Sequence, residues 1–502
     1  MTARADRPAS GVGPRVLMGA SILLGSNLVV RVLGLFSLVI LARLLSPEDY
    51  GIQGLAMVVV AFTNVLSSVR INDAIIRLRQ VDDSHYRTAF TLSALRGLLA
   101  GSAIFVFAEP VAGWMGEPAV GPVLQVLALM PVIGGLHNPR FVDFARRLNL
   151  TSEAVVNVAA QSATIAVSIA LALIWGNYWA LVFGSVAAVL VSTVLTYVLL
   201  PHRPGLGLRH WRMFLGFGGW LAGGQLLHFT NYKIDRLVIG SQIGTVALGH
   251  YSMGFQIASL SSQQMAAVFN RAIYVGLSHV NHDKARLRQA YRRAQSTVLG
   301  IVLPIGIGSA LLAREIVLVL AGSQWLPAIP VLQVLAPALA IGTVAAGTGA
   351  MLKVEGDTRA MFLREALNFA VRMPVLFLGL YTFGLMGVVY AHAFGRVFGT
   401  VTILHLARRF TGEPIYGPIL SGWRSLASCA LMTLALLALG TVLPSAGFGA
   451  FENALHLLLK VAVGGGVYLA AHATFWALQG RPDGFEAVAF SIVQRLLKRI
   501  GF

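Results

Sequence analysis

Residues 213–240 read MFLGFGGWLAGGQLLHFTNYKIDRLVIG, and this stretch decides the fold class. It is long enough to cross a bilayer as a helix at about 1.5 Å of rise per residue. Its second half nevertheless carries charged side chains, each of which costs roughly 2.5–3.5 kcal/mol at mid-membrane depth. At about 100° per residue, one side of the helix collects Gln225, His228, Asn231, Tyr232, Asp235 and Arg236, with only Lys233 outside this polar stripe. The stripe must face protein or water, so the helix lines a cavity or its charged end lies near an interface.

The composition of the whole chain is that of a membrane protein. Hydrophobic residues make up 56% and charged residues only 12% of the 502 residues, and the mean hydropathy is +0.74. These values lie far outside the soluble globular range and predict an all-α polytopic membrane protein. The single cysteine, Cys429, excludes an internal disulfide and any metal site built from several cysteines. We predict no cofactor and no metal site.

The charge of the loops predicts the topology. Apolar segments long enough to span the membrane recur about fourteen times along the chain. The loops after even-numbered segments are basic, among them those that hold Arg146, Arg286 and Arg408, whereas the loops after odd-numbered segments hold almost no basic residue. By the positive-inside rule, both termini are cytoplasmic. The formal net charge of +18 therefore reflects topology, and no nucleic-acid partner is predicted.

The chain also contains an internal repeat. The segment PVLQVLA at residues 122–128 recurs unchanged at residues 330–336, and Gly176 and Gly384 keep the same separation. An identity of this length in register with flanking glycines is improbable between unrelated leucine-rich helices. Equivalent helices are six spans apart along the chain, an even offset, so the repeats run parallel and are related by an axis along the membrane normal.

The repeat and the spans together predict the domain organisation. Two six-helix lobes, related by pseudo-two-fold symmetry, enclose a midline cavity, and two further helices follow. The predicted parts are a cytoplasmic tail at 1–16, the first lobe at 17–200, a cytoplasmic linker at 201–212, the second lobe at 213–409, two additional helices at 410–480 and an amphipathic cytoplasmic helix at 481–502.

Three motifs carry a family resemblance. They are LARLLSPEDYGIQGLA from Leu41 to Ala56, GNYWALVFG from Gly176 to Gly184 and DRLVIGSQIGTVALGHYSMG from Asp235 to Gly254. With two six-helix lobes plus two helices, the chain resembles the polysaccharide-export flippases, which are Wzx-type members of the MOP exporter superfamily. That superfamily also contains multidrug extruders and the lipid II flippase. The resemblance runs from about Leu17 to Arg409, and its motifs contain no catalytic signature.

This resemblance implies a transport function. The expected cargo is an undecaprenyl-pyrophosphate-linked oligosaccharide, moved by alternating access across the bacterial inner membrane for exopolysaccharide, capsule or O-antigen assembly. Membrane lipids and the polysaccharide polymerase and export machinery are the expected partners. A lipid II flippase or a multidrug or metabolite antiporter is the alternative. A membrane enzyme such as an O-antigen polymerase is disfavoured, because the loops predicted outside are short and no nucleophile–base pair stands out.

Cations predominate among the charged residues inside the predicted spans. Arg31, Arg372 and Arg396 are the deepest, and a guanidinium offers paired donors to phosphate oxygens. Purely structural arginines are the alternative interpretation. The residues predicted to bind the cargo are Arg31, Gln225, His228, Asn231, Tyr232, Lys233, Arg236, Arg372 and Arg396.

Asp235 is the predicted ion-coupling residue. It is the only carboxylate well inside the polar stripe of residues 213–240. A carboxylate beside Arg236 and near Lys233 can alternate between a salt bridge and a protonated or sodium-bound state. The alternative is a structural ion pair that neutralises Arg236.

Overall fold

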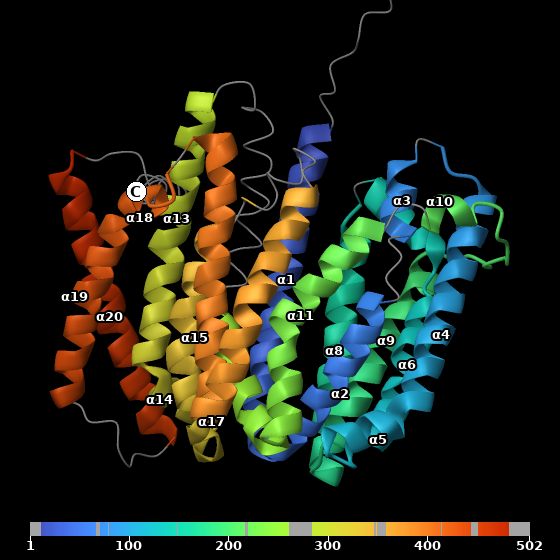
Figure 1. Ribbon diagram of the computed structural model, residues 1–502, viewed down its shortest axis with the longest axis horizontal. Coiled ribbons are helices and arrows are strands. Elements are labelled where there is room, and N and C mark those ends of the chain that lie inside the picture. The colour runs from blue at the N-terminus through green and yellow to red at the C-terminus, as the bar shows by residue number, and fades with distance from the viewer. Residues whose placement is uncertain are drawn as a thin grey trace, which may run out of the picture. The chain divides into compact units, whose positions relative to one another are not determined.

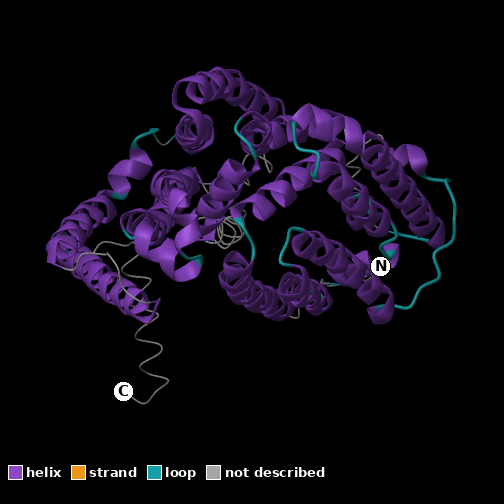
Figure 2. Cartoon of the chain, turned by 90° about the horizontal axis from the view of Figure 1, so that it is seen from below, coloured by secondary structure: helices purple, strands orange, loops and turns teal. Residues whose placement is uncertain are grey.

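The computed structural model describes residues 12–66, 71–78, 80–147, 149–215, 219–260, 284–345, 348, 358–412, 414–442 and 450–480. Within these residues every regular element is a helix and no strand occurs (Figure 2). Ten helices are long and apolar enough to cross a membrane, or eleven if one bent pair of helices counts as a span. The chain is therefore an all-α, multi-pass membrane protein.

Large apolar side chains are exposed along the long helices. Phe107 is 60% exposed, Ile174 72% and Leu378 67%. A soluble monomer rarely exposes contiguous apolar surface on this scale. A bilayer core accepts such side chains and demands that every backbone polar group is satisfied within the protein, which helices achieve.

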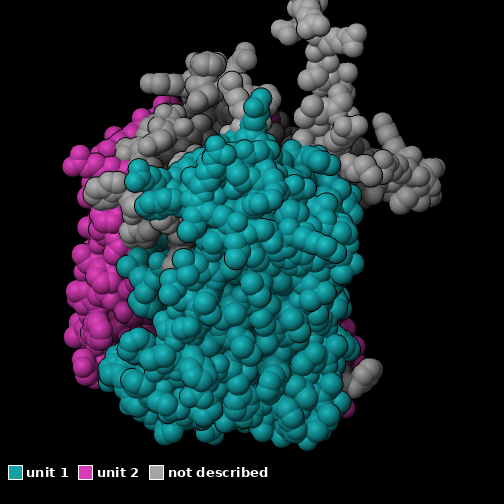
Figure 3. All heavy atoms as spheres, turned by 90° about the vertical axis from the view of Figure 1, so that its right-hand side faces the viewer, with its two compact units in different colours: residues 1–226, 240–245 teal, residues 227–239, 246–502 magenta. Residues whose placement is uncertain are grey.

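The chain forms two compact units, coloured separately in Figure 3. Unit 1 comprises residues 1–226 and 240–245, and unit 2 comprises residues 227–239 and 246–502. The elements of unit 1 are α1 (Val12–Leu44), α2 (Pro47–Leu66), α3 (Ile71–Arg77), α4 (Asp83–Met115), α5 (Val120–Leu127), α6 (Leu129–Gly135), η1 (Pro139–Phe141), α7 (Val142–Arg146), α8 (Thr151–Trp175), α9 (Trp179–Leu199) and α10 (Trp211–Leu215). Within this unit α8 packs along α9, and α1 packs against α8.

Unit 1 contains one bent pair of helices. The helices at Val120–Gly135 and Pro139–Arg146 meet at an angle of 60°. Pro139 favours the break because it cannot continue a helix with a full set of hydrogen bonds. Asn138 stabilises it, because its Nδ2 donates to the carbonyl oxygens of Thr196 at 3.1 Å and Leu200 at 2.7 Å. The sequence predicts this span as one segment ending near Asn138, and the structure extends it by a second, bent piece.

Unit 2 holds the middle of α11 (Gly219–Gln242) and the chain from residue 246 on. The two ends of α11 belong to unit 1. Its further elements are helical residues 245–260, α13 (Lys284–Leu311), α14 (Ala313–Leu320), η2 (Ser323–Ala328), α15 (Ile329–Gly342), η3 (Thr343–Ala345), α17 (Thr358–Thr411), α18 (Gly417–Ser421), α19 (Trp423–Val442) and α20 (Ala450–Leu478). Within the unit, α13 packs against α15 and α19, α15 against α17, and α19 against α20 (Figure 1). The end of the predicted span Leu248–Leu277, from residue 261 on, and the whole predicted amphipathic helix at 481–502 lie outside the described residues.

The element α17 is two helices joined at a glycine. It runs from Thr358 to Thr411, and Gly384 inside it has φ 57° and ψ −130°. Only glycine adopts this conformation readily, because it has no Cβ. The break separates the two predicted segments that flank Gly384, and it places Arg372 on the first half of α17 and His392 on the second.

The repeated heptapeptide buries the same apolar positions in both units. In unit 1 it lies in α5 and ends at Ala128, in the turn before α6, and in unit 2 it lies in α15. Six of its apolar side chains are fully buried: Val123, Leu124 and Leu127, and their counterparts Val331, Leu332 and Leu335.

A close helix contact recurs at both copies of the repeat. In unit 1, a Cβ added at Gly101 of α4 would lie 2.7 Å from the carbonyl oxygen of Ala128. In unit 2, a Cβ added at Gly306 of α13 would lie 3.0 Å from the carbonyl oxygen of Ala336. Both glycines therefore allow a neighbouring helix to approach the last residue of the heptapeptide.

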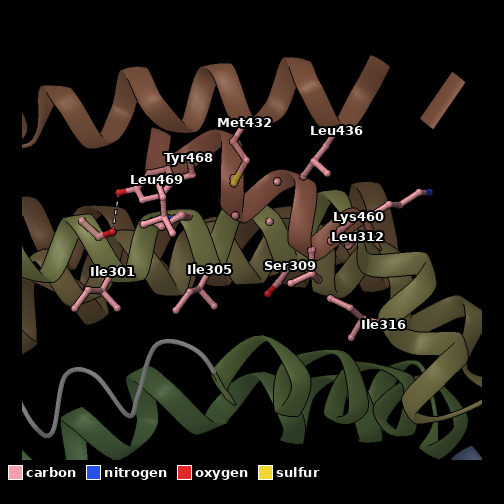
Figure 4. A pocket seen from close by; sticks show the side chains of 16 residues that line it. Ile301, Ile305, Ser309, Leu312, Ile316, Met432, Leu436, Lys460, Tyr468 and Leu469 are labelled. Carbon is pink, nitrogen blue, oxygen red and sulfur yellow. Dashed lines mark hydrogen bonds between the residues drawn. The ribbon is translucent and has the colours of Figure 1, made fainter. Parts of the chain in front are cut away.

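An apolar pocket of about 370 Å³ lies within unit 2 between α13, α14, α19 and α20. Figure 4 shows Ile305, Met432 and Leu436 lining it, with Lys460 at one end. The Nζ of Lys460 lies 2.5 Å from Oε1 of Glu315, and both residues are 4% exposed. A buried ion pair thus joins α20 to α14 beside the pocket.

Candidate functional site

The polar stripe of α11 faces the two halves of α17. Asn231 Nδ2 donates to the carbonyl oxygen and to Oε2 of Glu365, both at 3.1 Å. His228 Nδ1 lies 3.4 Å from Oε1 of the same carboxylate, which also pairs with Arg364. His228, Asn231 and Asp235 are spaced so that they lie on one face of the helix, as the sequence predicts. Most of the stripe is therefore satisfied by protein groups of unit 2.

Asp235 is the centre of a buried cluster, which we call the Asp235 cluster and which also contains Tyr251, Arg372 and His392. Arg372 Nη2 donates to Oδ1 and to Oδ2 of Asp235, both at 2.6 Å. His392 Nδ1 lies 2.5 Å from Oδ2, and the Tyr251 hydroxyl donates to the same oxygen at 3.2 Å. Asp235 has no exposed surface, and Arg372 is only 4% exposed. Both oxygens of the carboxylate thus accept hydrogen bonds, from helical residues 245–260 and from both halves of α17.

The pairing of Asp235 differs from the sequence interpretation. Sequence reasoning set Asp235 against its neighbour Arg236, but adjacent residues on a helix do not face each other. Arg236 instead lies over the ring of Phe255, with 5.4 Å between the guanidinium carbon and the ring centroid. The structure gives Asp235 a partner, Arg372, that is distant in sequence. Removing one member of such a buried pair costs about 3–5 kcal/mol, because an uncompensated charge is left behind.

A second arginine of α17 lies next to the cluster. The Arg396 guanidinium carbon lies 5.4 Å from the centroid of the Tyr232 ring. Arg372, His392 and Arg396, with Tyr232 and Asn231, line a cavity of about 10 Å³, which is the size of one water molecule. Among the described residues, Nε and Nη1 of Arg372, Nε of Arg396 and Nε2 of His392 are buried without a hydrogen-bond partner. The residues that line the cavity thus carry several nitrogen atoms without a hydrogen-bond partner among the described residues.

The family follows from comparison with known proteins. Residues 40–330, more than half of the chain, match the model of a family described as polysaccharide biosynthesis protein. The chain belongs to this family. The resemblance inferred from the three motifs is thereby confirmed.

Two relatives of this polysaccharide biosynthesis protein and one solved structure are informative. An "Uncharacterized membrane protein in cps region" of Klebsiella pneumoniae is 22% identical over 450 residues, covering 88% of this chain and 92% of the relative. The succinoglycan biosynthesis transport protein ExoT of Rhizobium meliloti is 26% identical over 327 residues, covering 64% of this chain and 66% of the relative. The lipid II flippase MurJ in an inward closed conformation matches with a TM-score of 0.72 at 15% identity, covering 91% of this chain and 99% of MurJ. At that identity the likeness to MurJ shows the fold alone.

The remaining predicted site residues of this polysaccharide biosynthesis protein are partly exposed. Lys233 and Arg236 lie on α11 in unit 2, and Gln225 lies on the part of α11 that belongs to unit 1. Arg31 lies in α1 of unit 1, with its side chain partly exposed inside an apolar span. An arginine at such a depth is costly unless function or a partner retains it.

Sequence reasoning missed three residues of the site. Glu365, His392 and Tyr251 were not predicted, although the first two are ionisable residues inside predicted spans, which by itself marks a functional site. The site was predicted from the polar stripe of residues 213–240, because several polar residues on one helix face form a stronger pattern than a single polar residue in a span.

A polar cluster of unit 1 lies at the start of α4. Asp82, His85 and His210 bring possible metal ligand atoms within 4.8 Å of one another. The two histidine rings are stacked with 4° between their planes and 3.9 Å between centroids, so their nitrogen lone pairs lie in parallel planes and do not converge on one ion. Hydrogen bonds from Ser84 and His85 lower the pKa of Asp82, which caps α4. The arrangement is that of a helix cap.

Proposed function

We propose that this protein is a flippase that moves a lipid-linked oligosaccharide repeat unit across the inner membrane by alternating access, for exopolysaccharide, capsule or O-antigen biosynthesis. The observation that carries the proposal is the membership of a multi-pass helical chain in the polysaccharide biosynthesis family. A relative named as a succinoglycan biosynthesis transport protein supports transport as the activity. A transporter needs no catalytic residues, and we assign none.

The proposed architecture has about fourteen spans. Two six-helix lobes, at 17–200 and 213–409, are followed by two additional helices within 410–480, and both termini are cytoplasmic. The buried heptapeptides and the matching contacts at Gly101 and Gly306 support an internal repeat. In this arrangement one lobe moves against the other during transport.

The proposed cargo is an undecaprenyl-pyrophosphate-linked oligosaccharide, handed on to the polysaccharide polymerase and export machinery. Its pyrophosphate is an anion that cannot remain unpaired at mid-membrane depth. Partly exposed cations are suited to bind it, and we assign this role to Arg31 and Arg396, with the partly exposed polar residues of α11 around the sugar. Arg372 is buried against Asp235, so we assign it to the Asp235 cluster and to ion coupling.

Transport by the purified protein tests the proposal. Liposomes containing the protein and a fluorescent undecaprenyl-pyrophosphate-linked oligosaccharide are expected to move the label between leaflets faster than protein-free liposomes. Arg31→Ala is expected to slow this movement about tenfold or more, because a charge-assisted hydrogen bond contributes about 1.5–3 kcal/mol. Arg31→Lys is expected to recover only part of the rate, since the paired geometry of the guanidinium is lost.

Arg409→Ala is the matched control, because Arg409 is an exposed arginine in the last turn of α17. Its rate is expected to equal that of the wild type. Label movement no faster than in protein-free liposomes would refute the proposed function. A wild-type rate for Arg31→Ala would remove Arg31 from cargo binding and leave the flippase proposal standing.

A further inference from the structure

His392 is the imidazole of the Asp235 cluster, and a neutral imidazole can bind one more proton at its unprotonated nitrogen. The ordinary pKa of a histidine lies near 6.5, whereas arginine, tyrosine and aspartate titrate far from neutrality. Its Nδ1 lies 2.5 Å from Asp235 Oδ2, which places the Nδ1 proton in that hydrogen bond. Its Nε2 is buried and has no hydrogen-bond partner among the described residues. Nε2 is therefore the nitrogen with a free lone pair, and His392 lines the small cavity together with Arg372 and Arg396.

The ligands around Asp235 do not suit a metal cation. Hard cations such as sodium or calcium are held by several oxygen ligands. Both carboxylate oxygens of Asp235 are taken by Nη2 of Arg372, and one of them also by His392 and Tyr251. The guanidinium already occupies the position that a metal ion would take beside the carboxylate. A proton needs no such shell, because it binds to a single nitrogen lone pair.

Protonation of His392 would add a second positive charge beside the Asp235 carboxylate. Four ionisable groups face the imidazole: Asp235 from α11, Tyr251 from helical residues 245–260, Arg372 from the first half of α17 and Arg396 from its own half. The ring of Phe255 covers it edge-on at 5.5 Å. A neutral His392 leaves Arg372 as the only full positive charge on Asp235. An imidazolium competes with Arg372 for the same carboxylate and repels both arginines.

The Asp235 cluster joins α11 to both halves of α17. Its contacts must therefore change if either half of α17 shifts its packing on α11. Arg372 and His392 lie on opposite sides of the break at Gly384, and Asp235 lies on α11. A change of charge at His392 therefore shifts the preference of Asp235 between the two halves of α17. A ligand shifts a conformational equilibrium by its differential affinity for the two states, and here the ligand is a proton.

We infer that the ion coupled to transport is the proton and that His392 takes it up at Nε2, exchanging the partner of Asp235 between Arg372 and the imidazolium. The proton enters from water on one side of the membrane and leaves to water on the other, so no further reactant is needed. This inference rests on the proposed flippase function and names its coupling ion.

The test compares a proton gradient with a sodium gradient in the same liposomes. With the membrane potential held at zero, a gradient of one pH unit is expected to shift the distribution of labelled cargo between leaflets about tenfold, if one proton moves for each cargo. A sodium gradient at constant pH is expected to leave the distribution unchanged. A pH-sensitive dye inside the liposomes is expected to report proton movement when cargo is present and none when it is absent.

His392→Gln supplies the matched variant, because glutamine keeps a polar side chain and does not titrate. Its cargo distribution is expected to be the same with and without the pH gradient. Arg409→Ala changes an exposed arginine outside the Asp235 cluster, so it is expected to keep the response to the pH gradient. His392→Gln with a wild-type response would overturn the role of His392.

The wild-type measurements decide the matter even if His392→Gln does not fold. Cargo movement that follows the sodium gradient, or that ignores the pH gradient, contradicts proton coupling and leaves the flippase function intact. No cargo movement under any gradient refutes the flippase function itself, and the inference falls with it. Exchange of potassium for sodium is expected to leave the melting temperature of the purified protein unchanged, and a sodium-specific rise would also contradict the inference.

Discussion

The ion pair between Asp235 and Arg372 holds two helices of this membrane protein in one arrangement. Each charge is costly in apolar surroundings, and the two are tolerated because they meet at 2.6 Å with further hydrogen bonds on the carboxylate. The pair brings α11 and the first half of α17 into one arrangement. We expect it to contribute more to the choice of conformation than to net stability, because a buried ion pair is often matched in stability by apolar residues of similar volume.

Gly395 makes room for Arg372, and its replacement is a test at the residue scale. A Cβ added there would lie 2.6 Å from Cδ and 2.8 Å from Nε of Arg372. Gly395→Ala is therefore expected to displace the guanidinium from Asp235 and to lower the free energy of unfolding by about 1–3 kcal/mol through overpacking. The readouts are the melting temperature in detergent and the response of cargo transport to a pH gradient.

Gly440→Ala is the control for this substitution. Gly440 lies inside α19, and nothing lies within 4 Å of a Cβ added there. The substitution is expected to stabilise the helix by up to about 1 kcal/mol, because alanine has the higher helix propensity. Equal behaviour of the two alanine variants would show that the close approach at Gly395 has no effect on the site.

At the scale of elements, the buried pair of Lys460 and Glu315 joins α20 to α14. Lys460→Met removes the cation that Glu315 contacts at 2.5 Å, and we expect a loss of about 3–5 kcal/mol in the free energy of unfolding. The double variant Glu315→Gln with Lys460→Met removes both charges and is expected to recover most of this loss. Thermal unfolding followed by size-exclusion chromatography in detergent measures both variants. A double variant no more stable than Lys460→Met would show that charge compensation is not the cause.

The long helices follow from apolar composition and from local breaks. The break at Gly384 separates two predicted spans, and the capped start of α4 at Asp82 marks the end of a basic loop. The bent piece after Asn138 was not predicted, because the hydrogen bonds to Thr196 and Leu200 that hold it come from residues far along the chain. Local signals therefore predict where spans begin and end better than they predict how a span bends.

At the scale of the whole molecule, the predicted topology is tested by labelling single cysteines in a Cys429→Ser background. Arg147→Cys and Arg409→Cys place exposed reporters in loops predicted to be cytoplasmic, and Glu452→Cys places one in a loop predicted to be periplasmic. A membrane-impermeant reagent applied from the periplasm is expected to label Glu452→Cys alone. Labelling of either arginine position in intact cells would reverse the predicted orientation. Permeabilised cells, in which all three positions react, supply the control for accessibility.

The sequence by itself determined the class and family of this protein. Composition and the recurrence of apolar segments suffice for an all-α membrane protein, because a bilayer leaves few structures that satisfy the backbone. The polar stripe of α11 was also readable, since a helix places residues of known spacing on one face. Short glycine and aromatic motifs were enough to indicate the family.

Only the tertiary structure decided which residues form the site. Asp235 could be assigned to a site from the sequence, but its partners Arg372, His392 and Tyr251 lie on other helices and are brought to it by packing. Sequence reasoning paired it with Arg236, the nearest cation along the chain, although the side chains of adjacent helical residues diverge. The spacing of residues within one helix is set by local geometry, whereas contacts between helices depend on how all of them pack together. For that reason the face of α11 was predictable and the groups opposite it were not.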